Sequence, residues 1–175
     1  MKNRINIEVF KETIEKGKKD SSSCLKTLAI EGTWRLDADS GPQFETKLKT
    51  ENAGEVLVQS DETIILGGGG TAPNPVQYCI GGLLACYSAT FVKLLSMDGI
   101  ILKSFKIRAT ANMDLSAALG LSENPPISNL KIELDIESDE SQEKLLEINE
   151  LAKKRCPGYY CLTHGIIPQI DINKN

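Results

Sequence analysis

The most informative stretch of this sequence runs from Asn74 to Gly99 and reads NPVQYCIGGLLACYSATFVKLLSMDG. Asn74 is a favourable N-cap, and Pro75 suits the first position of a helix. Gly99 is suited to end a helix, so the stretch predicts a helix from Pro75 to about Met97. Nearly every residue between is apolar or small, which is typical of a buried central helix.

This predicted helix is not expected to cross a membrane. Its apolar run, residues 78–95, is interrupted by glycines, by hydroxyl-bearing residues and by Lys93. A spanning helix needs about 20 consecutive, predominantly apolar residues. Residues 1–20 are charged throughout and lack the apolar region of a secretory signal. We therefore expect a cytoplasmic protein without a membrane partner.

Shorter helices and several strands flank the central helix. The patterns predict helices at residues 7–19 and 141–155, the second ended by the sequence Cys156-Pro157-Gly158. Strands are predicted at residues 25–36, 44–48, 55–59, 100–113, 127–136 and 165–172. Because strands do not alternate regularly with helices, this order predicts an α+β fold with a largely antiparallel sheet. The length suits a single domain, residues 1–175, with residues 1–20 as an N-terminal helical extension.

Composition excludes several functions. The formal net charge is -4, and no basic patch stands out, so a nucleic-acid partner is not expected. The four glycines at 67–70 are not followed by the Lys-Ser/Thr of a phosphate-binding loop, so they predict a close approach of the backbone to the central helix or a mobile lid. His164 is the single histidine, which argues against acid-base chemistry centred on histidine. No cofactor is expected.

The cysteines remain as the candidates for chemistry. There are five of them: Cys24, Cys79, Cys86, Cys156 and Cys161. In a reducing cytosol cysteines serve as buried hydrophobes, metal ligands or redox groups. An odd number argues against a purely structural set of disulfides.

Two of these cysteines stand in distinctive surroundings. Cys86 lies about three turns into the predicted central helix, beyond the reach of the helix dipole, so a reactive Cys86 needs a neighbouring cation or hydrogen-bond donor. The alternative is a small hydrophobe in a packing face. Cys156 follows the basic residues 153–155, which favour a thiolate, or it is an inert thiol beside solvated cations. Cys79, seven residues before Cys86, is expected in the core.

A metal site is the other interpretation of the C-terminal cysteines. Cys156, Cys161 and His164 form a Cys-x4-Cys-x2-His pattern. Its spacing is not that of a standard zinc finger, and no fourth ligand is adjacent. This alternative stays open at the level of sequence, although no metal is expected.

Two segments of the sequence resemble motifs of the OsmC/Ohr family. The glycine-rich loop and Asn-Pro pair of residues 66–77, leading into residues 82–90, resemble the segment before and around the peroxidatic cysteine of that family. Residues 152–157, with the sequence AKKRCP, resemble the second helix, which ends in the partner cysteine followed by proline. The two cysteines are 156 − 86 = 70 residues apart, and the resemblance extends from about residue 31 to the C-terminus.

The resemblance implies an intertwined homodimer, in which central helices pack back to back within wrapped antiparallel sheets. It also implies reduction of an organic hydroperoxide by Cys86, which becomes a sulfenic acid. Cys156 then condenses with Cys86 to a disulfide, and an external dithiol reduces that disulfide. We accordingly expect a depressed pKa at Cys86 and faster alkylation of Cys86 than of Cys79.

The sequence departs from the family pattern at two points. Family members carry a glutamate shortly after the Asn-Pro pair, where this chain has Val76 and Gln77. The arginine that such a glutamate orients has no clear counterpart, since Arg35 lies on a different predicted segment. The chain therefore looks like a divergent OsmC-like protein. A non-catalytic member that binds a small molecule in an apolar cleft near Cys86 is the alternative to a peroxidase.

Overall fold

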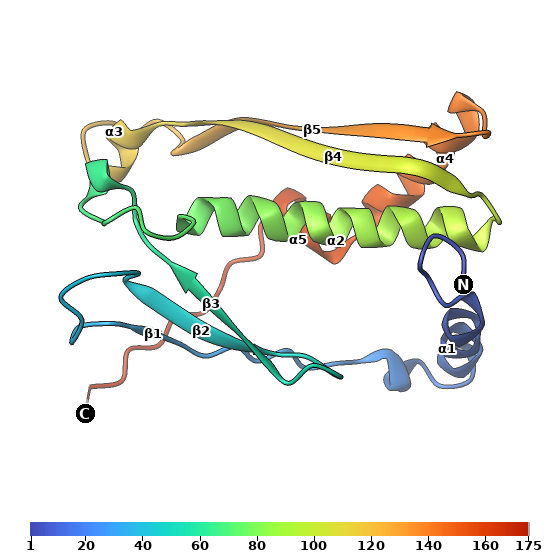
Figure 1. Cartoon of the computed structure of the whole chain (residues 1–175), viewed down its shortest axis with the longest axis horizontal. Coiled ribbons are helices and arrows are strands. Elements are labelled where there is room, and N and C mark those ends of the chain that lie inside the picture. The colour runs from blue at the N-terminus through green and yellow to red at the C-terminus, as the bar shows by residue number, and fades with distance from the viewer. Residues whose placement is uncertain (175) are drawn as a thin grey trace. The chain divides into compact units, whose positions relative to one another are not determined.

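A computed structural model describes residues 1–174 of the chain (Figure 1). The chain divides into two compact units: unit 1 holds residues 1–10 and those from Gly82 onward, and unit 2 holds residues 11–81. Helices and antiparallel strands occur together, and no regular βαβ alternation is present in the described residues. The predicted α+β class is therefore confirmed.

Unit 2 contains a three-stranded antiparallel sheet with the order β1-β2-β3. Gly54 has φ 73° in the turn that joins β2 to β3, a conformation that glycine adopts without steric cost, and the predicted hairpin is confirmed. The elements that precede α2 are α1 (Ile7–Lys19), η1 (Ser21–Cys24), β1 (Gly32–Trp34), β2 (Phe44–Lys49), β3 (Glu55–Ser60) and η2 (Ile64–Leu66).

The strand predicted at residues 25–36 is mostly wrong. Only Gly32–Trp34 forms a strand, paired with Phe44–Thr46 of β2. At the next residue toward the N-terminus, the Glu31 carbonyl accepts a hydrogen bond from the Thr46 hydroxyl at 2.6 Å. A side chain thus takes the place of the next backbone donor, and the ladder ends there.

The glycine run lies in a loop that turns back on itself. Gly68 passes so close to the backbone carbonyl of Glu62 that a Cβ would collide with it. The Asp61 carboxylate accepts hydrogen bonds from the backbone N–H and the hydroxyl of Thr71, at 2.8 and 2.7 Å. The close approach therefore occurs within the loop itself, whereas the sequence predicted an approach to the central helix.

The central helix α2 spans Pro75–Met97, as predicted. The Gln77 N–H donates to Asn74 Oδ1 at 2.9 Å, and the Asn74 N–H donates to Gln77 Oε1 at 2.9 Å. This reciprocal pair is a capping box, which satisfies two backbone donors at the start of the helix. Gly99, with φ 82°, ends the helical segment.

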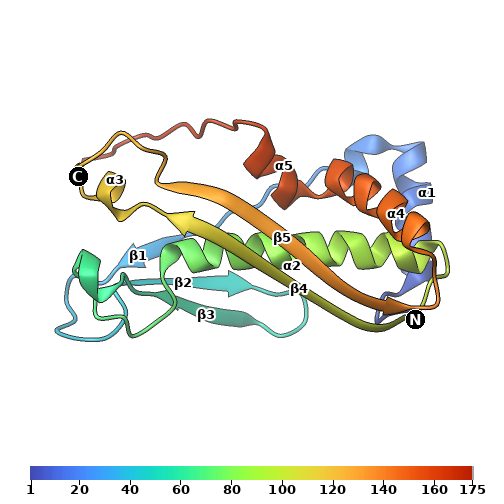
Figure 2. The same ribbon diagram turned by 90° about the horizontal axis from the view of Figure 1, so that it is seen from above.

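In unit 1 a long hairpin and two helices pack beside α2 (Figures 1 and 2). The hairpin strands pair antiparallel, with Phe105 opposite Ile136 and Ile107 opposite Leu134. The structure adds two short helices, α3 and α5, that the sequence patterns did not predict. The elements after α2 are β4 (Leu102–Met113), α3 (Leu115–Ala118), β5 (Ile127–Ser138), α4 (Gln142–Arg155) and α5 (Pro157–Thr163).

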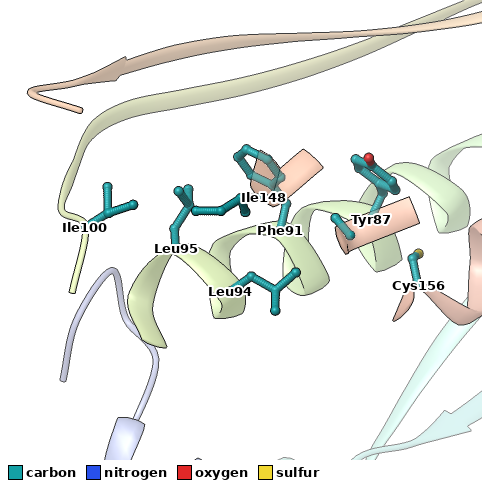
Figure 3. Packing of buried hydrophobic residues seen from close by; sticks show 8 residues of the cluster. Tyr87, Phe91, Leu94, Leu95, Ile100, Ile148 and Cys156 are labelled. Carbon is teal, nitrogen blue, oxygen red and sulfur yellow. The ribbon is translucent and has the colours of Figure 1, made fainter. Parts of the chain in front are cut away.

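The core of unit 1 forms around the C-terminal part of α2 (Figure 3). Phe91 is 1% exposed, Leu95 is fully buried, and Phe91 stacks on Phe105 of β4 with ring centroids 5.8 Å apart. Ile148 and Ala152 of α4 fill the same cluster. Full burial of each large apolar side chain stabilises the fold by roughly 1.5–3 kcal/mol.

Among residues 1–174, α2 is the one helix long and apolar enough to cross a membrane, a test that core helices of soluble proteins also pass. Its buried side chains pack against the hairpin and α4, as expected of a core helix.

The strand predicted at residues 165–172 is wrong: this segment has no regular structure, and its four isoleucines are exposed. No strand in the described chain pairs with it, and Pro168 lacks an N–H for a ladder.

Candidate active site

The candidate active site is a pair of thiols at the junction of three helices in unit 1. Cys86 comes from the middle of α2, and Cys156 stands between α4 and α5. The Cys156 Sγ lies 3.6 Å from the Cys86 Sγ. The structure therefore brings together both predicted site residues, which are 70 positions apart in the sequence.

Cys156 is placed by two helices that meet at it. Its N–H donates to the Ala152 carbonyl at 2.9 Å, which completes the last turn of α4. Its Sγ accepts the Tyr159 N–H at 3.4 Å, so the same residue caps α5. Pro157 occupies the first position of α5, where no N–H is needed. The fixed caps on both sides leave the Cys156 side chain with little freedom.

Tyr87 holds α4 against α2 next to the thiol pair. Its hydroxyl donates to Asn149 Oδ1 at 2.7 Å, and its side chain is 3% exposed. Burial, with smaller contributions from neighbouring acidic groups, raises the pKa of Tyr87 to about 12. The phenol therefore stays protonated and remains a hydrogen-bond donor at physiological pH.

The two sulfurs differ in their access to solvent. Cys156 is 1% exposed, whereas Cys86 is partly exposed. The Gly158 N–H donates to Cys86 Sγ at 3.4 Å. A reagent arriving from solvent therefore meets Cys86 before Cys156.

The expected depression of the Cys86 pKa is wrong in direction. Burial raises the pKa of the Cys86 thiol, and the neighbouring Cys156 thiol adds to the rise. The Gly158 N–H and the Lys93 cation act in the opposite direction but do not outweigh burial. Sequence reasoning placed Cys86 in a buried helix without weighing what that burial does to a thiolate.

The other three cysteines lie outside this pair. Cys24, Cys79 and Cys161 are exposed, so the expectation of a core position for Cys79 is wrong. His164 stacks on Tyr160, with ring centroids 4.1 Å apart. Within residues 1–174, no three His, Cys, Asp or Glu side chains gather as a metal site requires. The alternative set of Cys156, Cys161 and His164 therefore has no common centre.

Two positions at which the chain departs from the family pattern have other roles here. Gln77 uses its side chain to cap α2. Arg35, in unit 2, donates from Nη1 to the Pro42 carbonyl at 3.0 Å, and its Nε lies 3.9 Å from Glu45 Oε2. Neither residue was predicted to have these partners.

A hollow of about 460 Å³ in unit 1 is lined by apolar side chains and by the polar residues Asn149, Lys153 and Thr163, and neither Cys86 nor Cys156 lines it. Its wall includes Tyr87 and Tyr159, whose ring centroids are 5.9 Å apart. Leu130, Ile132 and Leu134 of β5 also line it. The sequence predicted this face of β5 through its alternating leucines and isoleucines, but it did not predict the hollow.

Comparison with known proteins places this geometry in a family. Residues 67–171 match the model of the OsmC-like protein family. No curated protein matches the sequence. Among solved structures, an OsmC-like protein from Mycoplasma pneumoniae is 17% identical with a TM-score of 0.56, covering 80% of this chain and 89% of that one.

Two further structures share the fold. An organic hydroperoxide resistance protein OsmC from Legionella pneumophila is 16% identical with a TM-score of 0.54, covering 80% of this chain and 93% of that one. A putative organic hydroperoxide resistance protein from Vibrio cholerae O1, with captopril bound in one of its active sites, is 18% identical with a TM-score of 0.54. It covers 81% of this chain and 88% of that one. Since the family model matches more than half of the sequence, this chain belongs to the OsmC-like protein family.

Proposed function

We propose that this protein reduces organic hydroperoxides, with Cys86 as the attacking thiol, Cys156 as its partner and an external dithiol as the reductant. The observation that carries the proposal is the 3.6 Å separation of the two sulfurs. Membership of the OsmC-like family supports it. So does the name of the Legionella pneumophila neighbour, an organic hydroperoxide resistance protein.

The difference in exposure supports this choice of roles for the two thiols. Cys86 is partly exposed and Cys156 is buried, so the peroxide reaches Cys86 first. The Cys86 thiolate attacks the outer oxygen of the hydroperoxide, and the O–O bond breaks. The alkoxide that leaves takes up a proton to become an alcohol, and Cys86 becomes a sulfenic acid.

The second half of the cycle uses the neighbouring thiol. Cys156 attacks the Cys86 sulfur, a disulfide forms and water leaves. An external dithiol then exchanges with this disulfide, regenerating both thiols while it is itself oxidised. Because burial raises the Cys86 pKa, we expect the first step to accelerate as the pH rises.

A homodimer is the second part of this proposal. Gly82, Ala85 and Ala89 lie three and four residues apart on α2 and are exposed, although the helix is apolar. Residues at this spacing share one face, and small side chains let a second helix approach closely. We propose that the partner's α2 covers this face in a single-domain, cytoplasmic protein with neither a nucleic-acid nor a membrane partner. A folded monomer in sedimentation at micromolar concentration would contradict the dimer.

The activity is tested by following consumption of cumene hydroperoxide in the presence of dithiothreitol. We expect Cys86→Ser to abolish it. In a separate reaction without dithiothreitol, Cys156→Ser should complete one attack and then accumulate sulfinic acid at Cys86 when peroxide is in excess. Cys161→Ser, at an exposed cysteine outside the pair, is the matched control and should keep full activity. A Cys86→Ser protein with full activity contradicts the proposal.

The hollow lined by Tyr87 and Tyr159 favours a second candidate function, the binding of a small amphipathic molecule without redox chemistry. In that case the double variant Cys86→Ser, Cys156→Ser binds 8-anilinonaphthalene-1-sulfonate as tightly as the wild type, and cumene hydroperoxide leaves both thiols reduced. Oxidation of the thiols by one equivalent of hydroperoxide rejects this candidate.

A further inference from the structure

Gly158 packs so closely against Cys86 that an added Cβ would be crowded. A Cβ on Gly158 would lie 3.1 Å from Cys86 Cβ and 3.3 Å from Cys86 Sγ, both tighter than ordinary van der Waals contact. It would also lie 3.7 Å from Leu83 Cα. The Cys86 Cβ is attached directly to the backbone of α2, so it cannot swing away as the end of a long side chain could. A side chain at position 158 would therefore require α5 and α2 to separate by a few tenths of an ångström.

The local backbone gives no other reason for a glycine at position 158. Gly158 is not among the glycines with positive φ, so an L-residue can adopt its conformation. It lies in α5, and glycine is one of the least favourable residues within a helix. On local conformation alone, alanine would stabilise α5. The close approach to Cys86 is what requires glycine.

The close approach gives each sulfur its own backbone donor. Pro157 has no N–H, so Gly158 supplies the first N–H after Cys156, and it donates to Cys86 Sγ at 3.4 Å. The next N–H, from Tyr159, donates to Cys156 Sγ at 3.4 Å. A hydrogen bond from an N–H stabilises a thiolate more than a thiol, because the acceptor then carries a charge.

We propose that Gly158 is a catalytic residue acting through its backbone: its N–H stabilises the Cys86 thiolate, and its missing side chain keeps Cys156 within reach of Cys86. This inference rests on the proposed function. It assigns to Gly158 an activating role in a chain that has Val76 and Gln77 after its Asn-Pro pair. The donor needs no side chain, so the sequence pattern alone does not reveal it.

The test compares Gly158→Ala with Gly165→Ala, a control in the same unit whose added Cβ would meet no atom within 4 Å. The rate of Cys86 alkylation by iodoacetamide is measured from pH 6 to 11 by mass spectrometry. A net contribution of about 0.5–1.5 kcal/mol from this hydrogen bond corresponds to roughly twofold to twelvefold, so we expect Gly158→Ala to slow alkylation at pH 8 by that factor and to shift its profile to higher pH. Gly165→Ala should match the wild type. A wild-type profile in Gly158→Ala overturns the inference.

A second measurement uses the wild-type protein, so it tests the inference even if the Gly158→Ala protein does not fold. In ¹⁵N-labelled protein, the Gly158 amide proton should move downfield with the same midpoint as Cys86 alkylation, and it should not titrate in Cys86→Ser. A Gly158 amide that stays constant through that pH range overturns the inference.

Neither test depends on peroxidase activity. If the wild type leaves hydroperoxide unreduced but both tests succeed, the proposed function fails and the role of Gly158 in stabilising the thiolate stands. If hydroperoxide is reduced and both tests fail, the proposed function stands and the role of Gly158 in stabilising the thiolate is rejected.

Discussion

Oxidation of the Cys86–Cys156 pair should stabilise the folded chain. The disulfide would close a loop of 156 − 86 = 70 residues, and the chain-entropy model gives about 4.4 kcal/mol at 25 °C for a loop of that length. The sulfurs must approach from 3.6 Å to roughly 2.05 Å, which offsets part of this gain. We therefore expect a net stabilisation of about 2–4 kcal/mol.

Urea unfolding of the oxidised and reduced forms, at one protein concentration, measures this difference. With a urea dependence of about 2 kcal/mol/M, typical of a small protein, the unfolding midpoint should rise by roughly 1–2 M on oxidation. Cys86→Ser, treated with the same oxidant, should show no rise. If the oxidised form unfolds at the same or a lower urea concentration, the two thiols cannot close without distorting the helix junction, and the pairing argument fails.

Further predictions concern single residues of unit 1. Tyr87→Phe should lower the free energy of unfolding by about 1–3 kcal/mol in urea titrations, because it leaves the Asn149 side-chain oxygen without its buried donor. Alkylation of Cys86 should have a higher midpoint pH in the folded protein than in the urea-unfolded protein, because burial raises the Cys86 pKa. Because its pKa is raised in the folded state, the protonated Cys86 thiol also contributes to the free energy of unfolding. This contribution is fully present below the pKa of the unfolded thiol and is lost as the pH rises through the pKa of the folded state. Asn3→Ala should cost about 2–3 kcal/mol of unfolding free energy, because the Asn3 side chain makes three hydrogen bonds to the end of α2 and the segment that follows it.

Local signals predicted the central helix and the long hairpin well. Asn74 and Pro75 start α2 with a cap and a fixed φ, and these signals depend only on neighbouring residues. The alternating apolar residues of β5 face the core because Leu134 and Ile136 pack against α2 and α4. Patterns of this kind carry their information within a few residues.

Helix α5 was missed although a related signal precedes it. Cys156-Pro157 plays the same role for α5 that Asn74-Pro75 plays for α2. Cysteine is not a common N-cap, so the pair indicated only the end of α4. The strand predicted at residues 165–172 was wrong for a different reason, since a strand needs a partner, and none in the described chain pairs with it.

The thiol pair was predictable and its electrostatics were not. The resemblance at Cys86 and at Cys156 implied that they meet, and the 3.6 Å separation is consistent with that. Whether the Cys86 pKa rises or falls depends on burial and on donors such as Gly158, which lies 72 residues away in the sequence. Contacts at that range follow from how the helices pack, which the local pattern does not specify.

The most direct test of the account is to map disulfides after adding one equivalent of cumene hydroperoxide to the fully reduced protein. Peptide mass spectrometry under non-reducing conditions should find one disulfide per chain, joining Cys86 to Cys156, with one equivalent of alcohol released. Cys24, Cys79 and Cys161 should remain reduced. The recovery of Cys86 and Cys156 as free thiols beside unreacted hydroperoxide, or a disulfide that joins other cysteines, would contradict the account.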